Sequence, residues 1–346
     1  MKRFDRGLVV GKFSPLHRGH ESLVAAALSQ CREVVLLSYT SPEYPRCEPG
    51  RRLQWLNELF PLARSLVLDG QRDVFPPNDA GAGIHHAFIA GILADRIGAP
   101  VDAVFTSEEY GEAFARDLTR LQRSGWPGAP TVSHVMFDRQ RAAVPISATR
   151  IRSDPWAHDD WLSAPVRAAY VERICLLGGE SSGKSTLAEA LGRALGEPVV
   201  GEYGRELWEE KRGALTYEDH LAIGLEQVRR EEVALRRARR YVVCDTSPLT
   251  TCFYSWETFG RCDPGLEALG GRRYEHLFVC DRDFPFVQDG TRRDAAFRER
   301  GQAWHEAELD KRGWTWVRLS GDVAARLSRV LAALGPTSCP TSPSAS

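Results

Sequence analysis

Short apolar runs alternate with amphipathic stretches along the whole chain, a pattern typical of parallel α/β architecture. In the first half, the predicted strands are 7–10, 34–38, 66–68, 103–106 and 132–136. The helical periodicities between them cover 21–28, 51–59, 85–96 and 112–123. In the second half, the predicted strands are 173–177, 241–244, 276–280 and 315–319. The predicted helices there are 184–195, 217–240, 294–311 and 322–333. The pattern predicts an α/β protein with two doubly wound parallel sheets.

A chain of 346 residues is long for one core, and its pattern breaks once. Pro155 interrupts the local helical pattern, and the polar, aromatic stretch after it lacks periodicity. The tail is rich in Pro, Ser and Thr, which is typical of disorder. We therefore predict a domain at 1–155, a linker at 156–172, a second domain at 173–334 and a disordered tail at 335–346.

Composition narrows the class of protein without identifying it. Hydrophobic residues make up 43% of the chain and charged residues 26%, as in an ordinary globular protein. The net charge of -1 gives no reason to expect nucleic acid as a partner. No apolar run is long enough to span a membrane, and the start lacks a secretion signal. The eight cysteines form no C-x-x-C pair, so we expect no zinc site and a reducing, cytoplasmic location; a homo-oligomer is left open.

A glycine-containing turn is expected where the first predicted strand ends. The segment 11–13 follows that strand, and a helix is predicted to begin near Gly19. Glycines let backbone N–H groups approach a ligand closely, and a helix N-terminus favours phosphate. His17 and His20 are three residues apart and can face one pocket, where they would stabilise charge on departing pyrophosphate. Taken alone, two histidines at a helix start are more often structural.

A second segment with similar chemistry lies far downstream, at 146–152. Ser147 or Thr149 can cap a helix, and Arg152 can bind a phosphate through two hydrogen bonds. Transfer at phosphorus depends mainly on positioning and charge stabilisation, so no nucleophile or acid–base pair is required.

Together, the patterns G-x-F-x-P-x-H-x-G-H and I-S-A-T-x-x-R resemble the signatures of the nucleotidyltransferase superfamily. Ala148 stands where the second Ser of that signature often lies. The resemblance implies that His17, His20 and Arg152 contact the phosphates of ATP in catalytic roles. The further ATP-binding residues that it implies are Gly11, Lys12, Phe13, Gly19, Ser147 and Thr149.

The second half contains a G-x-x-x-x-G-K-S motif between a predicted strand and a predicted helix. This context identifies a Walker A loop, and a chance glycine loop would not combine the strand, the lysine and the serine. Backbone amides would surround the phosphates of ATP, Lys184 would reach the β and γ oxygens, and Ser185 would bind Mg²⁺. The expected ATP-binding residues are Gly178, Gly179, Glu180, Ser181, Ser182, Gly183, Lys184, Ser185 and Thr186.

Three further features extend this second site. Asp245 ends an apolar strand and suits either the Mg²⁺ shell or the acceptance of a substrate proton, although a helix cap would explain it too. The cationic loop 287–293 suits a lid over the transferring phosphate or a solvated loop. The segment 202–205 suits contact with a nucleoside or a salt-bridged surface. The candidate lid and substrate residues are Glu202, Arg205, Asp289 and Arg292.

With both sites in this order, the chain up to about residue 334 resembles the bifunctional NadR-type family. The matching segments are 11–13 with 17–20, 52–55, 104–108, 147–152, 177–185, 202–205, 245–246 with 250–251, and 289–290 with 292. The family joins a Rossmann-like nicotinamide-mononucleotide adenylyltransferase to a P-loop ribosylnicotinamide kinase. The nicotinamide substrate is implied by this resemblance alone. Some members carry an N-terminal helix-turn-helix domain, which we do not expect here.

The hypothesis is a two-step enzyme that uses ATP and Mg²⁺. The second domain would phosphorylate nicotinamide riboside, and the first would join AMP to the resulting nicotinamide mononucleotide, giving NAD and pyrophosphate. Two alternatives are a fused coenzyme A pathway adenylyltransferase and kinase, and a nucleotide-sensing regulatory protein with inactive sites.

Overall fold

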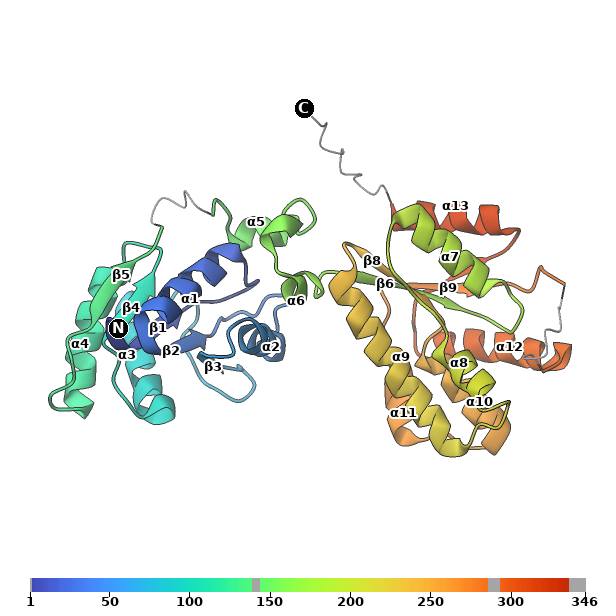
Figure 1. Cartoon of the computed structure of the whole chain (residues 1–346), viewed down its shortest axis with the longest axis horizontal. Helices are drawn as coiled ribbons and strands as arrows, with labels where there is room; N and C mark the ends of the chain where they lie inside the picture. The colour runs from blue at the N-terminus through green and yellow to red at the C-terminus, as the bar shows by residue number, and fades with distance from the viewer. Residues whose placement is uncertain (1, 139–143, 286–292, 336–346) are drawn as a thin grey trace, which may run out of the picture. The chain divides into compact units, whose positions relative to one another are not determined.

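The computed structural model describes residues 2–138, 144–285 and 293–335, which form two compact units. The first unit spans Met1–Tyr170 and the second Val171–Ser346. Each unit contains one five-stranded sheet in which every strand pair is parallel (Figure 1). The α/β class and the two parallel sheets expected from the sequence are therefore confirmed.

The first sheet has the strand order β3-β2-β1-β4-β5. Its strands are β1 (Phe4–Val10), β2 (Cys31–Ser38), β3 (Arg64–Val67), β4 (Ala103–Thr106) and β5 (Ser133–Met136). The main helices of this unit are α1 (Arg18–Gln30), α2 (Pro49–Leu59), α3 (Ala82–Ile92), α4 (Gly111–Gly125), α5 (Ala148–Ser153) and α6 (Ala164–Arg167). The strand order reverses between β1 and β4, and ligands of such sheets bind outside the carboxyl ends of the strands at this point.

Both faces of this sheet are buried, because successive side chains of a strand point to opposite faces. Val9 lies in the core beneath α1 and α2, whereas Leu8 lies in the core beneath α3 and α4. Val35 and Leu36 of β2 divide between the two cores in the same way. This two-sided burial explains why these strands are continuous apolar runs in the sequence.

The second sheet has the strand order β10-β9-β6-β8-β7. Its strands are β6 (Glu172–Leu177), β7 (Val199–Val200), β8 (Tyr241–Asp245), β9 (His276–Cys280) and β10 (Val317–Leu319). The helices are α7 (Lys184–Leu195), α8 (Tyr203–Glu210), α9 (Tyr217–Arg237), α10 (Pro248–Phe259), α11 (Pro264–Gly270), α12 (Ala295–Lys311) and α13 (Val323–Leu334). Helices α7 and α13 cover one face of the sheet, and α9, α10 and α12 lie on the other (Figure 1).

The sequence analysis did not anticipate β7, α8, α10 or α11. Strand β7 has only two residues and exists because Val199 and Val200 pair with β8 at the edge of the sheet. Helix α10 begins at Pro248 directly after a strand exit, where proline is tolerated in the first turn. Its composition is apolar on most sides, so no helical period is visible in the sequence.

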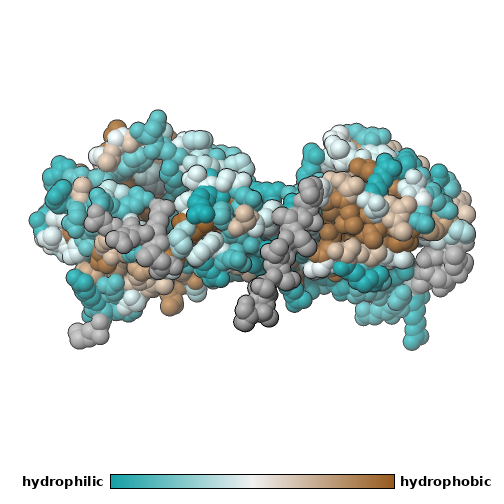
Figure 2. All heavy atoms as spheres, turned by 90° about the horizontal axis from the view of Figure 1, so that it is seen from above, coloured by the Kyte–Doolittle hydropathy of each residue, from teal (hydrophilic) through white to brown (hydrophobic). Residues whose placement is uncertain are grey.

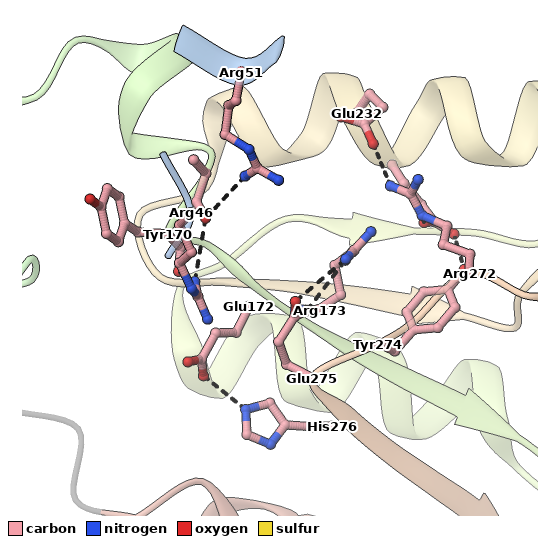
Figure 3. Close-up of polar contacts among 12 residues, drawn as sticks. Arg46, Arg51, Tyr170, Glu172, Arg173, Glu232, Arg272, Tyr274, Glu275 and His276 are labelled. Atoms are coloured by element: carbon pink, nitrogen blue, oxygen red, sulfur yellow. Dashed lines mark hydrogen bonds and ion pairs between the residues drawn. The ribbon is translucent and has the colours of Figure 1, made fainter. Parts of the chain in front are cut away.

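Most of the segment expected as a linker, 156–172, is folded against the first unit. Leu162, Val166 and Tyr170 are buried in the core beneath α1 and α2. Arg46 donates a hydrogen bond of 2.8 Å to the carbonyl of Tyr170 (Figure 3). Strand β6 begins two residues later, where the backbone N–H of Arg173 donates to Glu275 at 2.8 Å.

Figure 2 shows polar residues over much of the visible face, with an apolar area on the second unit. None of the helices in the described ranges is both long and apolar enough to cross a membrane. Within those ranges, no cluster of three His, Cys, Asp or Glu side chains is arranged to hold a metal ion.

Candidate active sites

A cavity of about 750 Å³ lies in the first unit, where the turn after β1 meets the end of β4. This is the point where the strand order of the sheet reverses. Every residue that the sequence analysis assigned to the first site lines the cavity: Gly11, Lys12, Phe13, His17, Gly19, His20, Ser147, Thr149 and Arg152.

The turn after β1 is held by a buried arginine. Phe13 adopts a left-handed backbone conformation, with φ of +47°, and its side chain is buried. The fully buried guanidinium of Arg52 donates to the carbonyl of Lys12 at 3.1 Å and to the hydroxyl of Ser38 at 3.0 Å. Both of these bonds come from Nη1, and the second terminal nitrogen, Nη2, pairs with Glu43 at 2.7 Å. Arg52, which matched the family pattern, therefore positions the turn from behind.

The two histidines lie together at the N-terminus of α1. His17 is the N-cap residue, and its Nδ1 accepts a hydrogen bond of 3.2 Å from the backbone N–H of Gly19. The ring centroids of His17 and His20 are 3.8 Å apart in a stacked arrangement, and the Phe13 ring packs edge-on against His20. The imidazoles thus lie where the helix N-terminus favours an anion.

Helix α5 brings the downstream segment to the same cavity. The Ser147 hydroxyl caps this helix by accepting from the backbone N–H of Arg150. Arg152 donates to the carbonyl of Ser14 and, at 3.2 Å, to the hydroxyl of Thr149. Its guanidinium also lies 4.0 Å from the centre of the Tyr44 ring. Arg152 therefore joins two segments that are far apart in the sequence.

The cavity also contains residues that sequence reasoning missed. The Tyr39 hydroxyl lies 2.8 Å from Nδ1 of His85, and the two rings are stacked. Burial raises the pKa of Tyr39 and lowers that of His85, so the phenol donates to a neutral imidazole. Asn78 and Tyr110 line other parts of the wall. These residues come from separate segments, so no spacing in the sequence could have linked them.

A second cavity, of about 440 Å³, lies in the second unit around the loop between β6 and α7. All nine residues that the sequence analysis assigned to ATP in this unit line it, from Gly178 to Thr186. Glu202 and Arg205 line it too.

Close packing explains the first two glycines of the loop. Gly178 has φ of +132°, and a Cβ there would lie 2.6 Å from the carbonyl oxygen of Cys280. A Cβ on Gly179 would lie 2.6 Å from the carbonyl oxygen of Arg298. The Gly179 N–H donates to Gln302 at 3.0 Å. The backbone can therefore take this path only with glycine at both positions.

Lys184 lies along the inside of the loop. Its ammonium group donates to the carbonyls of Gly178 and Gly179 at 3.0 and 2.9 Å. The chain leading into α12 contacts the loop at Glu180, which accepts from the backbone N–H of Arg293 at 3.0 Å and from the Tyr254 hydroxyl at 2.8 Å. The candidate lid residues Asp289 and Arg292 lie outside the described residues.

Two buried oxygens at the end of β8 are without hydrogen-bond partners in the described part of the chain. They are Oδ1 of Asp245 and the hydroxyl oxygen of Thr246. Thr246 has φ of +89°, which is strained for a β-branched residue. The N-cap position of α10 is Ser247, two residues after Asp245, so a helix cap does not explain Asp245. Such oxygens suit a hydrated cation or a bound ligand.

Glu202 and Arg205 lie at the start of α8, facing the same cavity. Burial raises the pKa of the Glu202 carboxyl; the charge of Lys184 opposes this effect, and that of Asp245 adds to it. Neither Glu202 nor Arg205 forms an ion pair with another described residue, so a salt-bridged surface does not explain them. A carboxylate with a raised pKa is a better proton acceptor than an exposed one.

Gln227, His220 and His305 also line this cavity, although sequence reasoning missed them. His305 is buried; its Nδ1 donates to the carbonyl of Gly301 at 2.6 Å, so its Nε2 accepts from the Thr250 hydroxyl at 2.9 Å. Burial lowers the pKa of His305 to about 4. This neutral imidazole connects α12 to α10 behind the cavity.

Comparison with known proteins gives one match within the second unit and others that cover most of the chain. Residues 173–326 match a family model described as an AAA domain. The trifunctional NAD biosynthesis/regulator protein NadR of Salmonella typhimurium is 28% identical over 303 residues, covering 83% of this chain and 71% of NadR. The Escherichia coli NadR matches to the same extent. This chain is a homologue of NadR.

Solved structures agree with this homology at the level of the fold. A NadR protein in complex with NAD and AMP-PNP superimposes with a TM-score of 0.68 at 19% identity, covering 96% of both chains. A NadR protein in complex with NR gives a TM-score of 0.70 at 20% identity, covering 95% of both chains. The similarity therefore extends over both units of the chain.

Proposed function

We propose that this protein makes NAD in two steps, phosphorylating nicotinamide riboside in the second unit and adenylylating the product in the first. The observation that carries the proposal is that each unit of this NadR homologue has its own cavity, lined by the residues expected to bind the phosphates of ATP. The first reaction creates the phosphate that the second reaction needs.

In the second unit, the loop 178–183 and the N-terminus of α7 would hold the triphosphate of ATP through backbone N–H groups. Lys184 would exchange its two carbonyl contacts for β and γ oxygens. The substrate 5′-oxygen attacks the γ-phosphorus, the bond to the β–γ bridging oxygen breaks, and ADP leaves. Glu202, with its raised pKa, would accept the hydroxyl proton.

Mg²⁺ fits the residues at this site. Asp245 and Thr246 each have an oxygen without a partner among the residues that the structure describes. With the hydroxyl of Ser185, these oxygens offer the hard donors, direct or through water, that Mg²⁺ prefers. Bound there, the ion would neutralise charge on the phosphates.

In the first unit, adenylyl transfer needs charge stabilisation more than proton transfer. A phosphate oxygen of nicotinamide mononucleotide attacks the α-phosphorus of ATP, and the bond to the α–β bridging oxygen breaks. His17, His20 and Arg152 would stabilise the pyrophosphate that leaves. Ser147 and Thr149 would bind the same phosphates from α5.

We place the protein in the cytoplasm, where thiols remain reduced. All seven cysteines within the described ranges are free, and six of them are buried.

The test is a substrate panel with products identified by mass. Purified protein with nicotinamide riboside, ATP and Mg²⁺ should form first the mononucleotide with ADP, and then NAD with pyrophosphate. Phosphopantetheine and dephospho-coenzyme A should give no product. If neither nicotinamide product appears at millimolar substrate, the proposal is wrong; binding without turnover would instead favour a regulatory protein.

A further inference from the structure

Gln227 occupies an unusual position on the wall of the second cavity. It lies on α9, where His220, Ile223 and Gln227 follow one another at helical spacing and all line the cavity. Only 2% of its surface is exposed. A polar side chain buried to this extent is expected to have hydrogen-bond partners at both ends of its amide.

The amide of Gln227 is satisfied at one end only. Its Oε1 accepts a hydrogen bond of 3.0 Å from the backbone N–H of Tyr203. This contact fixes which end of the amide is the oxygen, because a backbone N–H can only donate. The other end, Nε2, is buried and has no partner among the described residues. A residue of the cavity lining therefore contains a buried N–H donor without a partner in the described part of the chain.

The other buried glutamines of the described ranges do not share this feature. Gln122 donates through Nε2 to the carbonyls of Val101 and Pro130. Gln302 donates through Nε2 to Glu306 at 2.7 Å. Both are as buried as Gln227, and neither lines the cavity. Among these three glutamines, the amide without a partner therefore belongs to the one that lines the cavity.

The two residues of α9 that line the cavity beside Gln227 are uncharged, whereas the charged residues of the lining, such as Glu202 and Arg205, lie on other segments. Ile223 is apolar, and His220 donates through Nδ1 to the carbonyl of Thr216 at 2.9 Å. Burial lowers the pKa of His220, so it carries no charge near neutral pH. A neutral carbonyl oxygen loses less hydration energy beside such a wall than a carboxylate does.

We propose that Nε2 of Gln227 donates to the carboxamide oxygen of the nucleoside base, so that this residue selects riboside substrates bearing a neutral carbonyl group. The inference rests on the proposed kinase function and adds a specificity-determining residue to it. A site built to hydrogen-bond one substrate group discriminates strongly against analogues that lack it.

The test compares two nucleosides that differ only in this group, nicotinamide riboside and N-ribosylpyridinium. In Gln227→Met, kcat/KM for nicotinamide riboside should fall about 10- to 100-fold, while that for N-ribosylpyridinium should change less than about threefold. Gln227→Glu keeps an acceptor for the Tyr203 N–H and removes the donor, so it should also lose the preference for nicotinamide riboside.

Gln302→Met is the matched control, because Gln302 is equally buried but holds the Gly179 N–H of the phosphate loop. It should lower kcat/KM for both nucleosides alike. Equal losses on both substrates in the Gln227 variants would overturn the inference while leaving the kinase assignment intact. If Gln227→Met does not fold, Gln227→Glu decides. Wild-type protein that phosphorylates no nicotinamide riboside would overturn the proposed function itself.

Discussion

Individual side chains divide the chemistry between the two cavities. Lys184 donates to two carbonyls of the loop in the second unit, and His20 stacks on His17 in the first. Each cavity is lined by residues of one unit alone. Substitutions at these positions should therefore separate the two reactions.

Lys184→Ala should abolish phosphorylation, by at least about 100-fold in kcat, because it removes the cation expected at the β and γ oxygens. Adenylylation of supplied nicotinamide mononucleotide should remain. The measurement is the rate of ADP release beside the rate of pyrophosphate release. Lys211→Ala serves as a control, since that lysine pairs with Asp219 on the surface. Loss of both reactions would contradict the division.

His20→Ala should have the reverse effect. Adenylylation should fall at least about 100-fold, because a donor to the departing pyrophosphate is lost. Phosphorylation of nicotinamide riboside should proceed at the wild-type rate, and it doubles as a check on folding. An unchanged rate of NAD formation from the mononucleotide would show that His20 has no such role.

His305 should make stability depend on pH. Burial, assisted by the charge of Lys184, lowers its pKa from 6.5 to about 4. As the pH falls, His305 therefore takes up a proton in the unfolded chain before it does so in the folded protein. Its contribution to the free energy of unfolding is complete above the unfolded pKa of 6.5 and declines as the pH drops towards 4. Between about pH 7.5 and about pH 5, the free energy of unfolding should fall by roughly 2 kcal/mol from this residue.

Chemical denaturation of His305→Gln at the two pH values checks this expectation. Glutamine keeps a donor and an acceptor between α10 and α12 but does not titrate. The pH dependence of the variant should be smaller than that of the wild type by about 2 kcal/mol. Identical slopes in the two proteins would assign the acid sensitivity to other groups.

At the scale of elements, the β6–α7 loop depends on close backbone contacts. Its path passes the end of β9 at Cys280 and the start of α12 at Arg298, leaving no room for side chains on Gly178 or Gly179. The same crowding fixes the direction of the amides that would bind phosphate. Stability and activity should therefore change together in this loop.

Gly178→Ala tests this coupling. We expect it to abolish phosphorylation and to lower the free energy of unfolding by at least about 2 kcal/mol, because the backbone is strained for alanine and the methyl group meets a carbonyl oxygen. Gly196→Ala is the control: its φ is +66°, nothing lies within 4 Å of an added Cβ, and it should cost only about 1 kcal/mol. Thermal unfolding and the ADP-release assay provide the measurements. Similar behaviour of both variants would contradict the packing argument.

At the scale of the whole molecule, each unit contains its own sheet, its own core and its own cavity. The reaction sequence requires only that the mononucleotide leave one cavity and enter the other. Nothing in the lining of either cavity requires both units to be active in the same molecule.

Mixing Lys184→Ala with His20→Ala should therefore restore NAD formation from nicotinamide riboside. Each variant supplies the reaction that the other lacks, and the mononucleotide passes through solution. The yield should fall when an enzyme that consumes free mononucleotide is added. A mixture that makes mononucleotide but no NAD would indicate that transfer between the sites must occur within one chain.

Local patterns in the sequence were sufficient to predict the two cavity-lining loops and most of the strands. A Walker A loop consists of a strand, a turn and a helix in succession, and residues 173–195 contain all three. Strands of a parallel sheet that has helices on both faces appear as apolar runs in the sequence, because the side chains on both faces are buried. The segment 156–170 has no helical or strand periodicity in its sequence. Only its packing against the core beneath α1 and α2 shows that it is folded.

The sequence by itself thus determined the fold class, the order of the two units and the residues of the loop after β1 and the loop after β6, because these depend on neighbours in the chain. Only the tertiary structure decided that Arg152 contacts Ser14, that Tyr39 contacts His85, and that Gln227 lines a cavity while its Nε2 has no partner among the described residues. These contacts join segments that the packing of helices and sheets brings together. No periodicity along the chain encodes them, because each contact depends on which face of a helix or strand is buried and on which element packs against it.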